Sequence, residues 1–415
     1  MTQPLRGVLA ARVFLCFALG YLLSYALRAV NAVIAPSLLG ELGLSNADLG
    51  LLSSAYFVAF GCMQLPLGIW LDKYGSRRTE SALLLVAALG AVVFASSTTL
   101  TGLWIGRALI GIGVSACLMA ALKAYRQWFA LERQSQLASW MLVAGTAGAL
   151  SATLPVTMAL PHIGWRGIFW LVAALLLMVS AAIFFFLRDV ESHYNQAARA
   201  GGATPSHAGD GYGSIFRDPY FWRLGVIGLA NHGIFFALQT LWAGPWLTTV
   251  LGKSQRDTGE ILFVFNFVLM LAYLALGWAA PRLLARGWNV HKVIGAGLVG
   301  MLLAQGAMLA TAAPSAWLLW PLLALFVPVT TLVQAHVGLA FPATLAGRAN
   351  SAYNLMLFIG AFATQWGFGL VVDAFKNGGA ATADAFRLTL AIAIALQLAA
   401  VIFFVASRAQ PAARH

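Results

Sequence analysis

The amino-acid sequence predicts an all-helical integral membrane protein with twelve transmembrane helices in two pseudo-symmetric six-helix bundles. Three observations lead to this fold class. Hydrophobic residues make up 61% of the 415 residues and charged residues only 9%, whereas soluble domains carry about 25% charged residues. The apolar residues form long stretches, and a bilayer core needs about 20 such residues per helix. A polar segment and an internal repeat divide these apolar stretches into two groups of six.

The individual stretches can be placed along the chain from their apolar content. The first is interpreted as a retained helix, because it continues without a small-residue cleavage site. We expect one bundle in residues 1–188, a flexible linker in 189–220 and a second bundle in 221–415. The twelve expected spans are 12–39, 48–71, 79–98, 101–124, 138–160, 166–188, 221–247, 258–281, 291–312, 315–340, 347–371 and 386–407.

The net charge of +12 is explained by topology. With the N-terminus placed in the cytoplasm, most of the basic residues fall in cytoplasmic segments, as the positive-inside rule requires. This predicts a multi-pass protein of a bacterial inner membrane, with both termini and the linker cytoplasmic. The expected partners are the lipid bilayer and a small-molecule substrate, with protons as a candidate coupling ion, and no nucleic acid. The three cysteines lack metal-ligand spacing, so we expect no metal site. We also expect no cofactor, no enzymatic activity and a monomer.

An internal repeat supports the division into two halves. When the chain is aligned with itself so that Pro36 meets Pro245, several further glycine, serine and aspartate positions coincide. These are Gly43 with Gly252, Ser45 with Ser254, Asp48 with Asp257, Gly50 with Gly259 and Gly68 with Gly277. Two repeats related by an axis along the membrane normal predict a substrate site between them.

The loop after the second expected helix reads GIWLDKYGSRR. It resembles the signature loop of the major facilitator superfamily (MFS) of secondary transporters, in which a glycine, an acid, a second glycine and several bases recur at this spacing. The resemblance implies the MFS fold and a conformational gate. The residues assigned to the gate are Gly68, Asp72, Lys73, Gly75, Arg77 and Arg78.

The chemistry of this signature loop (residues 68–78) suits a gate. Gly75 permits a tight turn, because glycine adopts positive φ at little cost. Asp72 is expected to face the N-terminus of the eleventh helix near Gly347, where the helix dipole attracts an anion. It is also expected to pair with Arg126 or Arg133 after the fourth helix, so that gate contacts bias alternating access.

Charged residues inside spans are functional hypotheses by default. Arg28 shares a helical face with Tyr25 and, less directly, Asn31, and its guanidinium fork suits a carboxylate or phosphate. The resemblance implies a substrate-binding arginine, and the alternative is a packing arginine. Arg107 begins a segment similar to a second superfamily motif, Arg-xxx-Gly-x-Gly. It is a proton-coupling candidate, with interhelical packing as its alternative.

The seventh expected helix carries a polar face that should meet Arg28 across the cavity. It contains Asn231, His232, Gln239 and Trp242. Since histidine titrates near neutral pH, His232 is the best proton-carrier candidate, with a substrate ligand or a satisfied core histidine as alternatives. Asn266, His336 and Gln365 are additional substrate-binding candidates from later helices.

None of the 13 acidic residues is expected at the middle of a span, whereas a positive interior favours an anionic or polar solute. The sequence therefore predicts a transporter that takes up such a solute by alternating access, with proton coupling. The alternative is a proton-coupled drug or metabolite efflux antiporter. A non-transporting membrane receptor would need a larger soluble domain than the linker supplies, and no catalytic motif supports a membrane enzyme.

Overall fold

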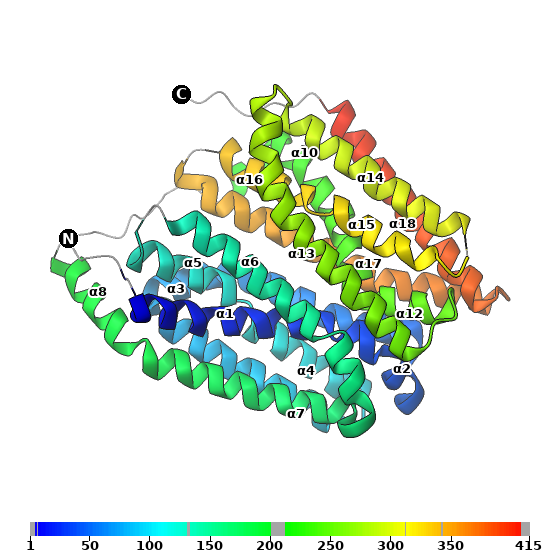
Figure 1. Ribbon diagram of the computed structural model, residues 1–415, viewed down its shortest axis with the longest axis horizontal. Helices are drawn as coiled ribbons and strands as arrows, with labels where there is room; N and C mark the ends of the chain where they lie inside the picture. Colours follow the sequence, from blue (N-terminus) through cyan, green and yellow to red (C-terminus); the bar gives the residue numbers. More distant parts are fainter. Residues whose placement is uncertain are drawn as a thin grey trace.

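The computed structural model describes residue 5 and residues 7–130, 133–200, 212–311, 313–341 and 343–407, and within these ranges every regular element is helical. The helices of the first half gather in the lower part of Figure 1 and those of the second half in the upper part. Ten helices in the described ranges are long and apolar enough to cross a membrane. The fold is therefore that of an all-helical integral membrane protein, as predicted.

The first half is built from eight helical elements. They are α1 (Gly7–Ala29), α2 (Asn31–Leu42), α3 (Asn46–Ser96), α4 (Leu100–Gly113), α5 (Cys117–Trp128), α6 (Gln134–Ser151), α7 (Leu154–Phe186) and α8 (Arg188–Ala200).

The second half begins with short elements and continues with longer ones. They are α9 (Tyr212–Arg217), α10 (Pro219–Ile227), the π-helix η2 (Gly228–His232), α11 (Gly233–Ala237), the π-helix η3 (Leu238–Trp242), α12 (Ala243–Thr249), α13 (Gln255–Ala285), α14 (Val290–Ala310), the 3₁₀-helix η4 (Ala316–Leu318), α15 (Leu319–Phe326), α16 (Val329–Ala340), α17 (Ala343–Asn377) and α18 (Thr382–Ala406).

Two long helices are bent sharply at glycines. Gly75 in α3 has φ +83°, and Gly164 in α7 has φ +64°. Both values lie in the left-handed region that glycine reaches without a Cβ clash. Immediately after the second bend, Trp165 Nε1 donates a 2.6 Å hydrogen bond to Glu41, which Arg166 also binds. The bend thus fastens α7 to the end of α2.

The predicted flexible linker at 189–220 is partly helical. α8 continues almost directly from α7, and Val190 and Glu191 on it are buried. The burial of one face of this segment stabilises it as a helix, which its polar composition alone did not predict. α9 occupies Tyr212–Arg217. Residues 201–211, which include Pro205 and Asp210 of the predicted linker, lie outside the described residues.

The repeat has the same local geometry in both halves. Gly43 and Gly252 have φ of +60° and +61°. In each copy the following serine caps a helix: Asp48 N donates to Ser45 Oγ at 3.0 Å, and Asp257 N donates to Ser254 Oγ at 3.1 Å. The aspartate side chains accept from the backbone N–H of the same serines. This reciprocal capping box satisfies two donors that a helix start leaves unpaired.

The two halves meet closely at one face of the molecule, the one that carries the turns at residues 43–45, 250–254 and 378–381 (the far face). A Cβ at Gly244 would collide with the Ala32 carbonyl oxygen, and a Cβ at Gly369 with that of Asn46. The helices α3 and α17 are thus in backbone contact there. At the opposite face, a Cβ at Gly68 or Gly347 would meet nothing within 4 Å. This is the arrangement of a molecule closed at its far face.

Candidate functional site

A cavity of about 140 Å³ lies between the two halves. On the first half it is lined from α1, α3, α5 and α6, and on the second half from the segments between η2 and α17. Arg28 is the one Lys, Arg, Asp or Glu among the residues that line it. The other polar lining residues are Tyr21, Ser24, Tyr25, Gln64, Ser115, Thr146, His232, Gln239, Tyr273, Thr331, Gln334 and Asn354. The cavity therefore offers a single permanent positive charge.

The Arg28 side chain projects from α1 and is only 7% exposed. Its Nε has no hydrogen-bond partner among the described residues. The guanidinium carbon lies 4.6 Å from the centre of the Tyr25 ring and between 5.3 and 5.7 Å from four further ring centres, those of Tyr56, Phe60, Phe236 and Phe358. Ring faces are electron-rich and attract a cation, so the aromatic cage (these five rings) holds the charge in place.

Two cavity residues come from the π-helical stretches of the seventh transmembrane segment. His232 ends η2 and Gln239 lies in η3. A π-bulge widens the turn and re-aims side chains, and it is frequent at functional sites. His232 Nδ1 is 2.8 Å from Thr330 Oγ1, whose own proton is donated to the Val327 carbonyl. Since Thr330 then accepts, we assign the His232 proton to Nδ1, which leaves Nε2 free to take another.

Several residues predicted to bind substrate make contacts between helices instead of lining the cavity. Asn31 donates to Ser53 Oγ at 2.8 Å, which fastens α2 to α3. Asn266 lies behind Gln239 and accepts its amide proton at 2.9 Å. His336 packs against His291 with ring centres 5.0 Å apart. Helical spacing predicted a polar face, but it could not say which side of each helix the partner helix would cover.

The same holds for three more predicted residues of the second half. Trp242 Nε1 donates to the Gln365 carbonyl at 3.2 Å, and its ring stacks on Phe368 at 4.8 Å. Gln365 Nε2 donates to Thr240 at 2.6 Å. Asn231 is fully buried in η2. None of the three is among the cavity-lining residues. Trp242 and Gln365 make the contacts of packing groups, whereas the Asn231 amide has no hydrogen-bond partner among the described residues.

Arg107 also lies away from the cavity. Its Nη1 donates to the Leu27 carbonyl at 2.8 Å, and its guanidinium carbon lies 4.9 Å and 5.3 Å from the ring centres of Phe94 and Phe169. Leu27 directly precedes Arg28. Arg107 therefore connects α4 to the turn of α1 that presents the cavity arginine, a contact that supports the packing alternative.

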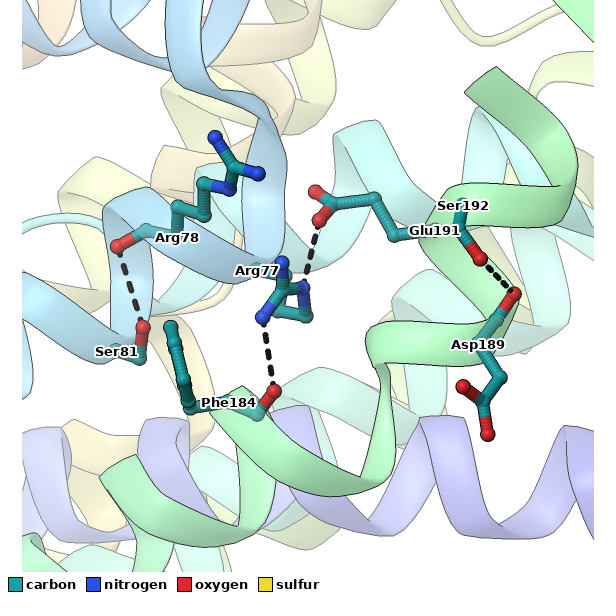
Figure 2. Close-up of polar contacts among 7 residues, drawn as sticks. All are labelled: Arg77, Arg78, Ser81, Phe184, Asp189, Glu191 and Ser192. Atoms are coloured by element: carbon teal, nitrogen blue, oxygen red, sulfur yellow. Dashed lines mark hydrogen bonds and ion pairs between the residues drawn. The ribbon is translucent and has the colours of Figure 1, made fainter. Parts of the chain in front are cut away.

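In the signature loop, Arg77 makes a buried ion pair. Its Nε lies 2.6 Å from Glu191 Oε2, and its Nη1 donates to the Phe184 carbonyl at 2.8 Å. Figure 2 shows Arg77 between Glu191 of α8 and Phe184 of α7. The two paired side chains are 6% and 8% exposed. A Cβ at Gly75 would lie 2.5 Å from Glu191 Oε1, so glycine is required there for space as well as for φ.

Asp72 pairs with a residue that the sequence reasoning did not select. Its carboxylate binds Lys123 of α5, whereas Arg126 and Arg133 are exposed. Lys123 lies almost one turn before Arg126, which brings its amine to the loop. Asp72 itself is 82% exposed, and Gly347 is open to its surroundings. The expected contact between Asp72 and the start of the eleventh helix is therefore not made while the far face is closed. Gly68, Lys73 and Arg78 are also exposed.

At the far face, Asp373 of α17 makes a contact that joins the two halves. It accepts 2.8 Å from Asn46 Nδ2 and 2.7 Å from the Ala47 backbone N–H, at the start of α3. A carboxylate at a helix N-terminus meets unpaired N–H donors and the positive end of the dipole. Sequence reasoning missed Asp373, and no motif marks it.

One acidic residue is fully enclosed, contrary to what the sequence suggested. Glu80 on α3 is 0% exposed and lies within a candidate span. A Cβ at Gly20 would lie 2.7 Å from its Oε1, and neither carboxylate oxygen has a hydrogen-bond partner among the described residues. We expected no acidic residue at the middle of a span, but Glu80 lies in the first-half core beyond the bend at Gly75. It does not line the cavity.

Comparison with known proteins agrees with this architecture. The family model described as Major Facilitator Superfamily matches residues 17–364. The chain is similar to the hexuronate transporter of Escherichia coli (strain K12), with 27% identity over 297 residues, 66% of this chain and 66% of that protein, just under two thirds of each. It is also similar to the membrane sensor protein UhpC of Escherichia coli (strain K12), with 22% identity over 401 residues, 88% of this chain and 87% of that protein.

Solved structures share the fold. A bacterial homologue of the human lysosomal transporter Spinster, in an inward-facing and unoccupied conformation, has a TM-score of 0.77 and 18% identity. That match covers 96% of this chain and 97% of the other.

Proposed function

Because this chain belongs to the Major Facilitator Superfamily, we propose that it is a secondary transporter that carries a small organic anion across a bacterial inner membrane by alternating access. The observation that carries the proposal is the cavity between the halves, in which Arg28 is the one permanently charged lining residue. A guanidinium presents a rigid fork of donors that matches a carboxylate. The similarity to a hexuronate transporter supports an organic acid as the cargo.

The geometry of the halves fits a transport cycle. Contacts at the far face hold one entrance closed, while Asp72 of the signature loop is exposed at the other. In the reverse state we propose that Asp72 meets the start of α17, so that one acid stabilises each closed end. Repeats that rock about a fixed midplane site are the usual basis of alternating access. With the termini in the cytoplasm, the present state would open inward.

Proton-coupled uptake is the finer part of the proposal, and His232 is its proton site. The residue lines the same cavity as Arg28, and its unprotonated Nε2 can take a proton. A protonated imidazole would add a second positive charge beside the anchored anion, so that proton and anion favour each other's binding. Efflux of the anion in exchange for protons, the alternative function, would use the same two residues, Arg28 and His232, with anion and proton moving in opposite directions.

The test is uptake of radiolabelled glucuronate and benzoate into proteoliposomes, with and without an inward proton gradient. Arg28→Ala should abolish uptake of every anion that the wild type carries, and Arg256→Ala, which removes an arginine that is 84% exposed, should not. Stimulation by the inward gradient, lost in His232→Ala, supports symport. Equal anion uptake by Arg28→Ala and wild type would refute the anchor.

A sensor function is the second candidate, because the similarity to UhpC covers most of both chains. The same vesicles separate the two. Binding of an anion in an Arg28-dependent way, without its accumulation or exchange under any gradient, would favour a sensor over a transporter.

A further inference from the structure

Four of the five rings of the aromatic cage line the cavity, and both halves contribute to them. Tyr25 and Phe60 come from the first half, and Phe236 and Phe358 from the second. The Phe60 and Phe358 ring centres are 4.5 Å apart across the boundary. A flat group beside Arg28 would therefore contact ring surface from both halves.

The amide and imidazole groups of the cavity are already paired with one another or with neighbours. Gln334 Nε2 donates to Asn354 at 2.9 Å, and Gln239 Nε2 donates to Asn266 at 2.9 Å. His232 is held by Thr330. One N–H of each of these two glutamines is therefore already committed to a protein partner.

Three of the aliphatic hydroxyls that line the cavity are committed in the same way. Each donates its proton to a carbonyl of its own helix at 2.7 to 2.9 Å: Ser115 to Ile112, Thr146 to Leu142 and Thr331 to Pro328. A sugar acid would bring several hydroxyls that need partners. Each hydroxyl left unpaired on burial weakens binding by about fivefold to a hundredfold.

We propose that the cavity selects an aromatic monocarboxylate over a polyhydroxylated sugar acid. The carboxylate binds the Arg28 guanidinium, and the ring stacks among Phe60, Phe236 and Phe358. The cavity volume of about 140 Å³ corresponds to roughly ten water positions, which suits a single ring with one carboxylate. This inference rests on the proposed function and specifies its substrate class.

The experiment compares three probes on the purified full-length chain: benzoate, cyclohexanecarboxylate and glucuronate. Binding is measured by isothermal titration calorimetry. Benzoate should bind at least tenfold more tightly than glucuronate. It should also exceed cyclohexanecarboxylate by about three- to tenfold, because ring–ring contact adds to apolar burial. Arg28→Ala should remove binding of both ring acids.

Matched variants test the cage itself. Phe358→Leu should remove the preference for benzoate over cyclohexanecarboxylate. Phe362→Leu changes a ring one turn along α17 that does not line the cavity and should keep the preference. Loss of the preference in both variants, or in neither, would overturn the role of the cage. The wild-type comparison of probes stands even if a variant fails to fold.

The outcomes distinguish the two levels of the proposal. Arg28-dependent binding of glucuronate that equals or exceeds that of benzoate would overturn the aromatic selectivity and leave an organic-anion transporter in place. Binding of all three acids that is unchanged in Arg28→Ala would overturn the proposed function as well.

Discussion

The contact of Asp373 with the start of α3 should determine how firmly the far face stays closed. Its carboxylate bridges α17 to Asn46 and Ala47 of the other half through two hydrogen bonds of 2.8 and 2.7 Å. Asp373→Ala removes both acceptors. It also leaves the N-terminal dipole of α3 without its nearest anion from the second half.

The magnitude follows from these two bonds. Hydrogen bonds to a charged group contribute about 1.5–3 kcal/mol each in net terms. Both are only partly buried, and water replaces them when the face opens, so the lower end applies. We expect Asp373→Ala to destabilise the closed far face by about 3 kcal/mol. Since about 1.4 kcal/mol is a factor of ten, the ratio of open to closed molecules should rise by about a hundredfold.

The assay is double electron–electron resonance between spin labels at Gly40→Cys and Asn377→Cys, one on each half. Gly40 has no atom within 4 Å of its Cβ position, and Asn377 is exposed. Cys62, the exposed native cysteine, is replaced by serine. Asp373→Ala should add a longer-distance population.

The matched control is Asp384→Ala, which removes a far-face acid that is paired within its own half with Arg387. It should leave the distance distribution unchanged. If Asp373→Ala gives the same distribution as Asp384→Ala, the contact does not hold the face closed and the reasoning is refuted.

Three further predictions concern stability and closure. Glu191→Gln leaves Arg77 buried without its counter-charge, which destabilises the fold by about 3–5 kcal/mol. The melting temperature of this variant, measured by intrinsic fluorescence, should fall well below that of Asp189→Asn. Equal melting temperatures would contradict this. The hydrogen bonds that the indole and the guanidinium of α7 donate to Glu41 lower its pKa below the ordinary 4.5. The stabilisation that ionised Glu41 provides is therefore fully present above pH 4.5 and is lost as the pH falls through the lowered pKa. Between pH 5 and about pH 3, the melting temperature of Glu41→Gln should consequently change less than that of wild type. Parallel curves of melting temperature against pH would refute this. Gly244→Ala places a methyl group against the backbone of α2 and should open the far face in the same spin-label assay, whereas Gly295→Ala, at an open position, should not.

The first-half core shows where reading the sequence succeeds and where it stops. Arg28 was selected because a charge inside a span is costly without a purpose, and it does line the cavity. The sequence placed none of the acidic residues at the middle of a span, yet Glu80 is fully buried in the long helix after the bend at Gly75. Proximity along the chain gives no information about the direction of a helix after a bend.

The second-half candidates show the same limit. His232 and Gln239 reach the cavity from two π-helical turns. Trp242 instead donates to the Gln365 carbonyl, and the Gln365 side chain donates to Thr240, in contacts between helices. Helical periodicity identified all four as polar positions. It could not separate lining from packing, because that depends on which neighbouring helix covers each face.

The sequence by itself determined the fold class, the signature loop, the repeat and the central arginine. Each follows from local chemistry: apolar length, glycine at a turn, a serine–aspartate cap and the cost of a buried charge. Only the tertiary structure decided that five rings surround Arg28, that Lys123 is the partner of Asp72, and that Asp373 joins the halves. These contacts join residues far apart in the chain, and their formation depends on how the two halves pack.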